Sequence, residues 1–259
     1  MENPQISSAF KNNNALIAFI TGGDPNIATT REIILEMAKN GVDLIEIGIP
    51  FSDPVAEGPV IEAADERALK SGTTVDHLFE MVASLQGEID IPLVFMTYAN
   101  PIFKYGAQKF MKKCKEVGIN GIIVPDIPFE ERNELKPYCT EFNIDQIHLV
   151  APTSKDRIKM IANDTDGFLY IVSSLGVTGM RDEVSTQISE MVKSAKQATD
   201  IPCAVGFGIS TKEHAKQILK ISDGIIIGSA IVNLIAKHGT DSPKVIGKFI
   251  KEIKDYCKN

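Results

Sequence analysis

The stretch LIEIG, residues 44–48, places a carboxylate inside an apolar run of the kind that forms β-strands. Side chains alternate between the two faces of a strand, so Ile45 and Ile47 share one face and Glu46 lies on the other. In a barrel of parallel strands, one face meets the surrounding helices and the other meets the barrel interior. The two isoleucines suit the helices, so we expect Glu46 to point inward near the carboxyl end of its strand.

Seven more short apolar runs are spaced along the chain. The eight are LIAFI (16–20), DLIEIG (43–48), PLVFMTY (92–98), GIIVPD (121–126), QIHLV (146–150), FLYIV (168–172), PCAVGF (202–207) and DGIIIGS (223–229). Segments with helical periodicity lie between them, such as 29–41, which Gly41 ends, and 241–257, which Ser242 and Pro243 begin. Alternating strands and helices predict parallel βαβ units, and eight of them favour an α/β fold of the TIM (β/α)8 barrel type. An open doubly wound sheet is the alternative.

The chain length of 259 residues suits one such barrel, which typically takes about 250 residues. We find no linker or low-complexity tract, so residues 1–259 are predicted to form a single (β/α)8-barrel catalytic domain with an extra N-terminal helix. Inserted segments follow the second strand: the loop FSDPVAEGP (51–59) and helices around 60–71 and 75–86. Long loops after barrel strands usually build the active site, although a tolerated surface insertion is the alternative.

Composition limits the partners and the compartment. The formal charge is 27 − 34 = −7, which disfavours binding to nucleic acid or to anionic membranes. No apolar run reaches membrane length and the first residues do not resemble a signal peptide, so we expect a cytoplasmic protein. The four cysteines are far apart and are expected to be reduced thiols: Cys114, Cys139, Cys203 and Cys257.

Glu46 is the first candidate for chemistry. The alternative is a buried glutamate neutralised by a neighbouring Arg or Lys, but none of the eight strand runs contains a basic residue that could do this. An unpaired carboxyl in an apolar surrounding has a raised pKa, because desolvation disfavours its charged form. Glu46 could then both donate and accept a proton near neutral pH.

Two glycine-containing turns follow the last two strands, GFGIS (206–210) and IGSA (227–230), and the second opens a helical run. Many barrels bind phosphate at this pair of loops, through backbone N–H groups and a helix N-terminus. We therefore expect a phosphorylated substrate. The segment SSLGVTGMRDEV (173–184) after the sixth strand could close as a lid or could be an ordinary solvated loop.

Several reaction classes lack the residues they need. No lysine lies in a strand run, which disfavours Schiff-base chemistry. The histidines are scattered at His77, His148, His214 and His238, so no metal site is expected. No nucleotide-binding motif is present. What remains is acid–base chemistry by carboxylates, without a cofactor.

A set of motifs resembles the tryptophan synthase alpha chain family. In chain order they are TGGDP (21–25), EIGIPFSDPVAEGP (46–59), YAN (98–100), GVTG (176–179), GFGIS (206–210) and GS (228–229). They extend from the first strand to the eighth. The resemblance implies a lyase of tryptophan biosynthesis that cleaves indole-3-glycerol phosphate to indole and glyceraldehyde 3-phosphate in a retro-aldol reaction.

The same resemblance implies roles for individual residues. Glu46 matches the glutamate that moves the protons, and Glu57 matches the second catalytic carboxylate, which accepts a hydrogen bond from the indole N–H; most relatives have aspartate there. Asp53 matches a loop that faces the beta subunit, although a simple solvated aspartate is the alternative. The residues that match the substrate-binding set are Phe19, Tyr98, Val150, Tyr170, Thr178, Gly179, Phe207, Gly208, Gly228 and Ser229.

The resemblance also implies a partner, a tryptophan synthase beta subunit that carries pyridoxal phosphate, in an α2β2 complex. This chain itself is expected to hold no cofactor and no metal. Three alternatives remain at this point: a catalytically weak subunit that mainly activates the beta subunit, a stand-alone lyase that releases indole, and a different barrel enzyme such as a phosphosugar isomerase.

Overall fold

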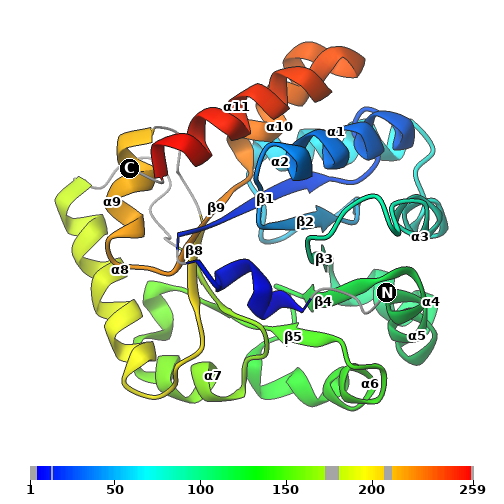
Figure 1. Cartoon of the computed structure of the whole chain (residues 1–259). Helices are drawn as coiled ribbons and strands as arrows, with labels where there is room; N and C mark the ends of the chain where they lie inside the picture. Colours follow the sequence, from blue (N-terminus) through cyan, green and yellow to red (C-terminus); the bar gives the residue numbers. More distant parts are fainter. Residues whose placement is uncertain (1–4, 13, 173–180, 207–211, 258–259) are drawn as a thin grey trace.

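The computed structural model describes residues 5–12, 14–172, 181–206 and 212–257, and its centre is one sheet of parallel strands (Figure 1). In the described part of the chain the strands are β1 (Ala15–Thr21), β2 (Leu44–Gly48), β3 (Leu93–Met96), β4 (Ile119–Ile123), β5 (Asp145–Ile147), β6 (Leu149–Val150), β7 (Leu169–Val172), β8 (Cys203–Gly206) and β9 (Gly224–Ile227). They pair in the order β5-β4-β3-β2-β1-β9-β8-β7-β6.

The two ends of this order belong to one interrupted strand. β5 and β6 are separated in the chain only by His148; β5 pairs with β4, and β6 pairs with β7. The sheet therefore closes on itself, and the predicted TIM barrel is confirmed. Strand 146–150, predicted as one piece, is divided at His148.

Helices surround the sheet (Figure 1). The predicted helix 29–41 begins two residues earlier, because the Asn26 side chain accepts a hydrogen bond from the Thr29 N–H and caps it; Gly41, just beyond its end, has a φ of +98°. The α-helices are α1 (Ile27–Lys39), α2 (Pro59–Lys70), α3 (Val75–Ala83), α4 (Ala99–Tyr105), α5 (Ala107–Val117), α6 (Lys136–Phe142), α7 (Ile158–Asp164), α8 (Arg181–Lys196), α9 (Lys212–Leu219), α10 (Ser229–His238) and α11 (Ser242–Cys257). Over the ranges that the structure describes, four 3-10 helices accompany them: η1 (Ile6–Phe10), η2 (Phe129–Glu134), η3 (Pro152–Arg157) and η4 (Gly239–Asp241).

The two faces of the sheet bury different sets of side chains. Ile45 and Ile47 belong to the large cluster between strands and helices, whereas Leu44, on the parity of Glu46, belongs to the cluster inside the barrel. The extra N-terminal helix is the 3-10 helix η1. Ile6 and Phe10 of η1 join the interior cluster and close the end of the barrel at which the strands begin.

The inserted helix α2 lies at the opposite end, where the strands finish. Its Ile61 and Ala64 form a third apolar cluster with Phe19 of β1 and Val232 of α10. α2 is tied to the loop after β1 by Arg67, whose guanidinium donates two hydrogen bonds of 2.8 Å to the buried carboxylate of Asp24. The insertion thus covers the barrel mouth, where barrel enzymes place their active sites.

Among the described residues, we find no helix with the length and apolar character needed to cross a membrane.

Candidate active site

Glu46 lies on β2 with Phe19 of β1 and Val94 of β3 as its neighbours across the sheet. Its side chain is completely buried, and neither carboxylate oxygen has a hydrogen-bond partner among the described residues. Burial raises the pKa of Glu46 to about 8, because desolvation disfavours the charged form. Glu46 is therefore an unpaired carboxyl with both protonation states accessible near neutral pH.

Two aromatic rings lie close to Glu46. Burial raises the pKa of Tyr170 on β7, and the charge of Glu46 raises this pKa further, so Tyr170, which belongs to the interior cluster, lies near Glu46. Glycines make room for the rings: a Cβ at Gly206 would lie 2.4 Å from the Tyr170 Oη, and a Cβ at Gly48 would lie 2.8 Å from the Phe19 Cζ. Phe19 and Tyr170 thus form apolar walls beside the carboxyl.

Glu57 occupies the loop that follows β2. Its carboxyl shares a hydrogen bond with that of Asp65 on α2 and lies against the Tyr98 hydroxyl, and burial raises its pKa. Tyr98 is buried, and its hydroxyl oxygen accepts a hydrogen bond of 3.2 Å from the Ala56 N–H. Tyr98 therefore holds the loop that carries Glu57.

Asp65 was not predicted from the sequence. It is only 3% exposed although it lies on a helix with many charged residues, and burial, followed by the charge of Glu57, raises its pKa to about 8. The residues around it gave no signal, because EAADER reads equally well as the solvated face of a surface helix.

Val150 does not lie with the interior residues. Along the interrupted strand, Ile147 and Leu149 contact the interior cluster, whereas Val150 belongs to the cluster between sheet and helices. Val150 shares its parity with His148, which packs against Phe129 on the helix side. In this structure Val150, predicted to line the pocket, lies on the helix side of the sheet, and Leu149 takes the inward position.

Gly228 and Ser229 form the start of α10. The N–H groups of Ile231 and Val232 already bond to the Gly228 carbonyl, and the amides before them have no acceptor within the helix. A Cβ at Gly228 would lie 3.3 Å from Phe19, so this helix start is close to the aromatic wall beside Glu46. The arrangement suits a phosphate group at the barrel mouth.

Five other predictions concern loops. Asp53 is exposed, and its carboxylate accepts a 2.5 Å hydrogen bond from the Ser52 hydroxyl. The remaining four residues lie outside the described part of the chain: Thr178, Gly179, Phe207 and Gly208.

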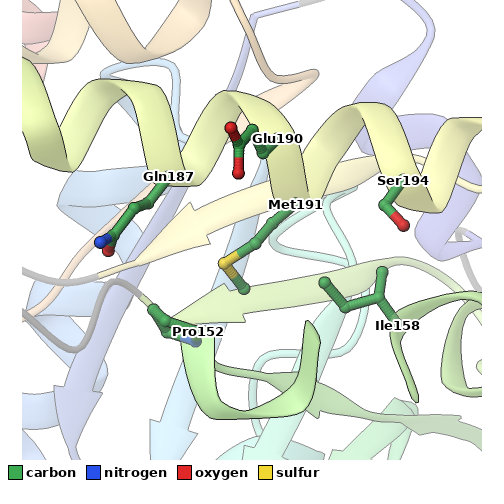
Figure 2. Close-up of a pocket in the computed structure, with 6 residues that line it drawn as sticks. All are labelled: Pro152, Ile158, Gln187, Glu190, Met191 and Ser194. Carbon is green, nitrogen blue, oxygen red and sulfur yellow. The ribbon is translucent and has the colours of Figure 1, made fainter. Parts of the chain in front are cut away.

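A depression on the outside of the barrel is lined by other residues. Figure 2 shows it between η3 and α7 on one side and α8 on the other, lined by Pro152, Ile158, Gln187, Glu190, Met191 and Ser194. None of the predicted site residues lines it. Within the described residues, no group of three or more His, Cys, Asp and Glu side chains could hold a metal ion.

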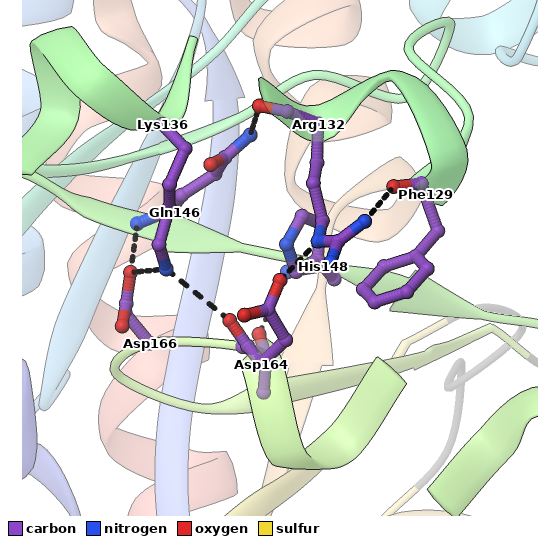
Figure 3. A network of polar contacts seen from close by, with 8 residues as sticks. Phe129, Arg132, Lys136, Gln146, His148, Asp164 and Asp166 are labelled. Atoms are coloured by element: carbon purple, nitrogen blue, oxygen red, sulfur yellow. Dashed lines mark hydrogen bonds and ion pairs between the residues drawn. The ribbon is translucent and has the colours of Figure 1, made fainter. Parts of the chain in front are cut away.

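His148 belongs to a polar network on the helix side of the barrel (Figure 3). The Phe129 ring packs edge-on against His148 at 5.3 Å, and Arg132 lies over the Phe129 ring and forms an ion pair with Asp164. Lys136 donates a 3.0 Å hydrogen bond to Asp166 in the same network. The buried His148 Nε2 has no hydrogen-bond partner among the described residues. His148 is thus a structural residue of the barrel wall.

We expect His148 to make the fold sensitive to acid. Burial lowers its pKa to about 4, a tendency that Asp164 and Asp166 oppose and Lys136 and Arg132 reinforce. Between pH 6.5 and 4 this histidine is protonated in the unfolded chain but not in the folded protein. The free energy of unfolding therefore falls as the pH falls, by up to about 3 kcal/mol. Urea unfolding of the wild type and of His148→Leu at pH 7, 6 and 5 measures this.

The His148→Leu variant should lose less stability than the wild type between pH 7 and 5, whereas His77→Gln, at an exposed position, should follow the wild type. Equal acid sensitivity of His148→Leu and the wild type would contradict this assignment.

Comparison with known proteins agrees with the motifs. The family model described as "Tryptophan synthase alpha chain" matches residues 7–258. The tryptophan synthase alpha chain of Lacticaseibacillus casei is 45% identical over 250 residues, which cover 96% of this chain and 94% of the relative. That of Thermoanaerobacter sp. (strain X514) is 48% identical over 245 residues, covering 95% and 92%.

Solved structures give the same result. Tryptophan synthase subunit alpha from Campylobacter jejuni superimposes with a TM-score of 0.85 at 36% identity, covering 94% of this chain and 97% of that one. A chain of the tryptophan synthase a2b2 complex from Pyrococcus furiosus superimposes with a TM-score of 0.88 at 35% identity, covering 94% and 98%.

Proposed function

The chain belongs to the tryptophan synthase alpha chain family, and on that premise we propose that Glu46 and Glu57 catalyse its reaction. It is a lyase of tryptophan biosynthesis that cleaves indole-3-glycerol phosphate. One observation carries the proposal: a completely buried carboxyl, without a partner among the described residues, in the interior of the barrel below its mouth.

Glu46 is proposed to move both protons of the retro-aldol step. A proton must be added to indole C3, and the glycerol hydroxyl next to the breaking bond must lose one as it becomes the aldehyde. When the carbon–carbon bond breaks, its electron pair returns to the protonated ring, and indole forms. A carboxyl with a pKa of about 8 exists in both forms at neutral pH and so suits this exchange.

Glu57 is proposed to accept a hydrogen bond from the indole N–H. Protonation at C3 leaves positive charge on the ring nitrogen, and a carboxylate at that point stabilises the charge as it develops. The rings of Phe19 and Tyr170 would hold the indole between them, since both lie beside Glu46. Tyr98 supports the Glu57 loop through its bond with Ala56.

The phosphate is proposed to bind at the start of α10, where Gly228 and Ser229 offer backbone N–H groups and a hydroxyl. By the family resemblance, Gly179 and Gly208 would complete this site, Phe207 would add to the indole pocket, and Thr178 would close over Glu57.

We also propose a beta subunit as partner, because the Pyrococcus furiosus relative assembles as an a2b2 complex. The loop at Asp53 is the proposed contact: Val55, two residues on, is 79% exposed, and Ala56 bonds to Tyr98 beside Glu57. Pyridoxal phosphate would belong to the beta subunit, and this chain would need no cofactor.

The whole chain, residues 1–259, is proposed to work as one catalytic domain, because one closed sheet organises the described residues. A cytoplasmic location fits the four cysteines, all of which are buried thiols.

The purified chain, assayed for release of indole from indole-3-glycerol phosphate with and without its beta partner, tests the proposal. We expect indole release in both cases and a higher rate with the partner. No release even with the partner, combined with faster turnover by the partner, would favour a subunit that only activates. Full rate without the partner would favour a stand-alone lyase.

A further inference from the structure

Two carboxyl groups meet at the edge of the barrel mouth. Asp65 on α2 is 3% exposed, and it shares a hydrogen bond with Glu57, eight residues earlier in the loop that leads into this helix. One oxygen of Glu57, Oε2, is buried without a hydrogen-bond partner among the described residues. Asp65 therefore approaches one side of the Glu57 carboxyl and leaves a buried oxygen for another donor.

None of the described residues that act on this pair of carboxyls carries a positive charge. Glu62 adds negative charge, the Tyr98 hydroxyl lies against Glu57, and the Phe51 backbone and the Thr21 hydroxyl lie against Asp65. Arg67, on the same helix, is bound in two places by Asp24. A buried pair of carboxyls in such a setting cannot lose both protons near neutral pH.

The neighbouring elements do not change this balance. β1 packs against α2 and contains no ionisable side chain. α10 meets α2 through the apolar Val232, and its two ionisable residues, Lys237 and His238, are in its last turn. Asp65 is 3% exposed whereas Glu57 is only half-buried, so Asp65 is the carboxyl that is harder to ionise, and the shared proton belongs on Asp65.

We propose that Asp65 is a positioning residue for the cleavage reaction: it keeps its proton, donates it in a hydrogen bond to Glu57, and so holds Glu57 ionised with its free oxygen available to the indole N–H. This inference rests on the proposed role of Glu57. It also fits the length of the Glu57 side chain, which reaches towards Asp65 on α2.

The test compares kcat for indole release between pH 7 and 9.5 in the wild type, Asp65→Asn and Asp65→Leu, each with its beta partner. Asparagine keeps a donor for Glu57 but cannot ionise. We expect Asp65→Asn to stay within about threefold of the wild type at pH 7, and the ratio of its kcat to that of the wild type to rise about tenfold by pH 9.5, because a proton with a pKa of about 8 is lost only from the wild type. Any contribution from the ionisation of Glu46 cancels in this ratio.

Asp65→Leu removes the donor and should lower kcat about 10- to 100-fold at pH 7. In a Glu57→Gln background the same substitution should lower kcat less than threefold, since the carboxylate that Asp65 positions is already absent. Glu66→Gln, an exposed carboxyl on the same helix, is the matched control and should leave both kcat and its pH profile unchanged.

A second measurement does not depend on turnover. Carbon-13 NMR of the protein labelled at aspartate carboxyls should contain a signal that titrates near pH 8 and is missing in Asp65→Asn. A flat kcat ratio, or an Asp65 signal that titrates near pH 4, would overturn the inference. If the inference about Asp65 fails in this way while the wild type cleaves the substrate and Glu46→Gln does not, the proposed function stands. If the wild type releases no indole even with its partner, the proposed function and the role of Asp65 are both contradicted.

Discussion

Glu46→Gln is expected to lower kcat for indole release by about 10³-fold or more, because Glu46 performs both proton transfers of the reaction. Glutamine keeps the shape and the polarity of the side chain but can neither donate an acidic proton nor accept one. Binding of substrate should change little, since the phosphate and the indole ring are held by other residues. The measurement is kcat and KM for wild type and variant, both with the beta partner.

A stability measurement on the same variant shows that lost activity is not lost folding. Folded Glu46 keeps its proton up to about pH 8 and the unfolded chain loses it near 4.5, so wild-type stability falls as the pH rises through this window. Glu46→Gln removes the penalty and should raise the free energy of unfolding at pH 8 by up to about 4 kcal/mol. Glu80→Gln, an exposed carboxyl on α3, should change neither activity nor stability.

Undiminished kcat in a folded Glu46→Gln protein would remove Glu46 from the mechanism. A Glu46→Gln protein that releases no indole and is less stable than the wild type at pH 8 would contradict the account of the buried, unpaired carboxyl.

Glu57→Gln is the second large effect, with an expected loss of about 10²-fold in kcat. The amide oxygen can still accept the indole N–H but lacks the charge that opposes the positive charge on the ring. The loss should appear in kcat rather than in KM, because that charge develops only as C3 is protonated. Steady-state kinetics on the folded variant, with its partner, gives the two constants separately.

Glu57→Asp tests the geometry of the same contact. It keeps the charge but shortens the arm by one methylene, and we expect an intermediate loss of about tenfold, since small displacements of catalytic groups are costly. Glu62→Gln is the control, because Glu62 acts on Glu57 only through its charge and is exposed. Wild-type kcat in Glu57→Gln would show that the charge at residue 57 is not used.

Much of the fold could be predicted from local patterns. The alternation in LIEIG is a local property of an extended chain, and in the structure Ile45 and Ile47 indeed face helices while Leu44 faces the interior. The start of α11 at Ser242 also follows from local preferences. At the break of the fifth strand, the His148 N–H donates to the hydroxyl of Thr165, 17 residues on, a contact that the sequence of the strand itself does not indicate.

A site residue could be predicted where the sequence pattern around it is enough to indicate its surroundings in the fold. Glu46 could be found because a carboxylate in an apolar strand is unusual in itself. Asp65 could not be found in this way, because it is buried by contact with the loop from Phe51 to Glu57. Helical periodicity does not predict such a contact between separate elements. Val150 was predicted to line the pocket by matching to the family, whereas the alternation of Ile147, His148 and Leu149 assigns residue 150 to the helix side, where it lies in the structure.

The central claim is that Glu46 is a carboxyl with both protonation states accessible at neutral pH, and direct titration of Glu46 tests it. Carbon-13 NMR of the protein labelled at glutamate carboxyls, with Glu46 assigned as the signal missing in Glu46→Gln, follows this one group from pH 4 to 10. The structure predicts a midpoint of about 8. A midpoint near the ordinary value of 4.5 would mean that Glu46 is solvated or paired, and would contradict the account.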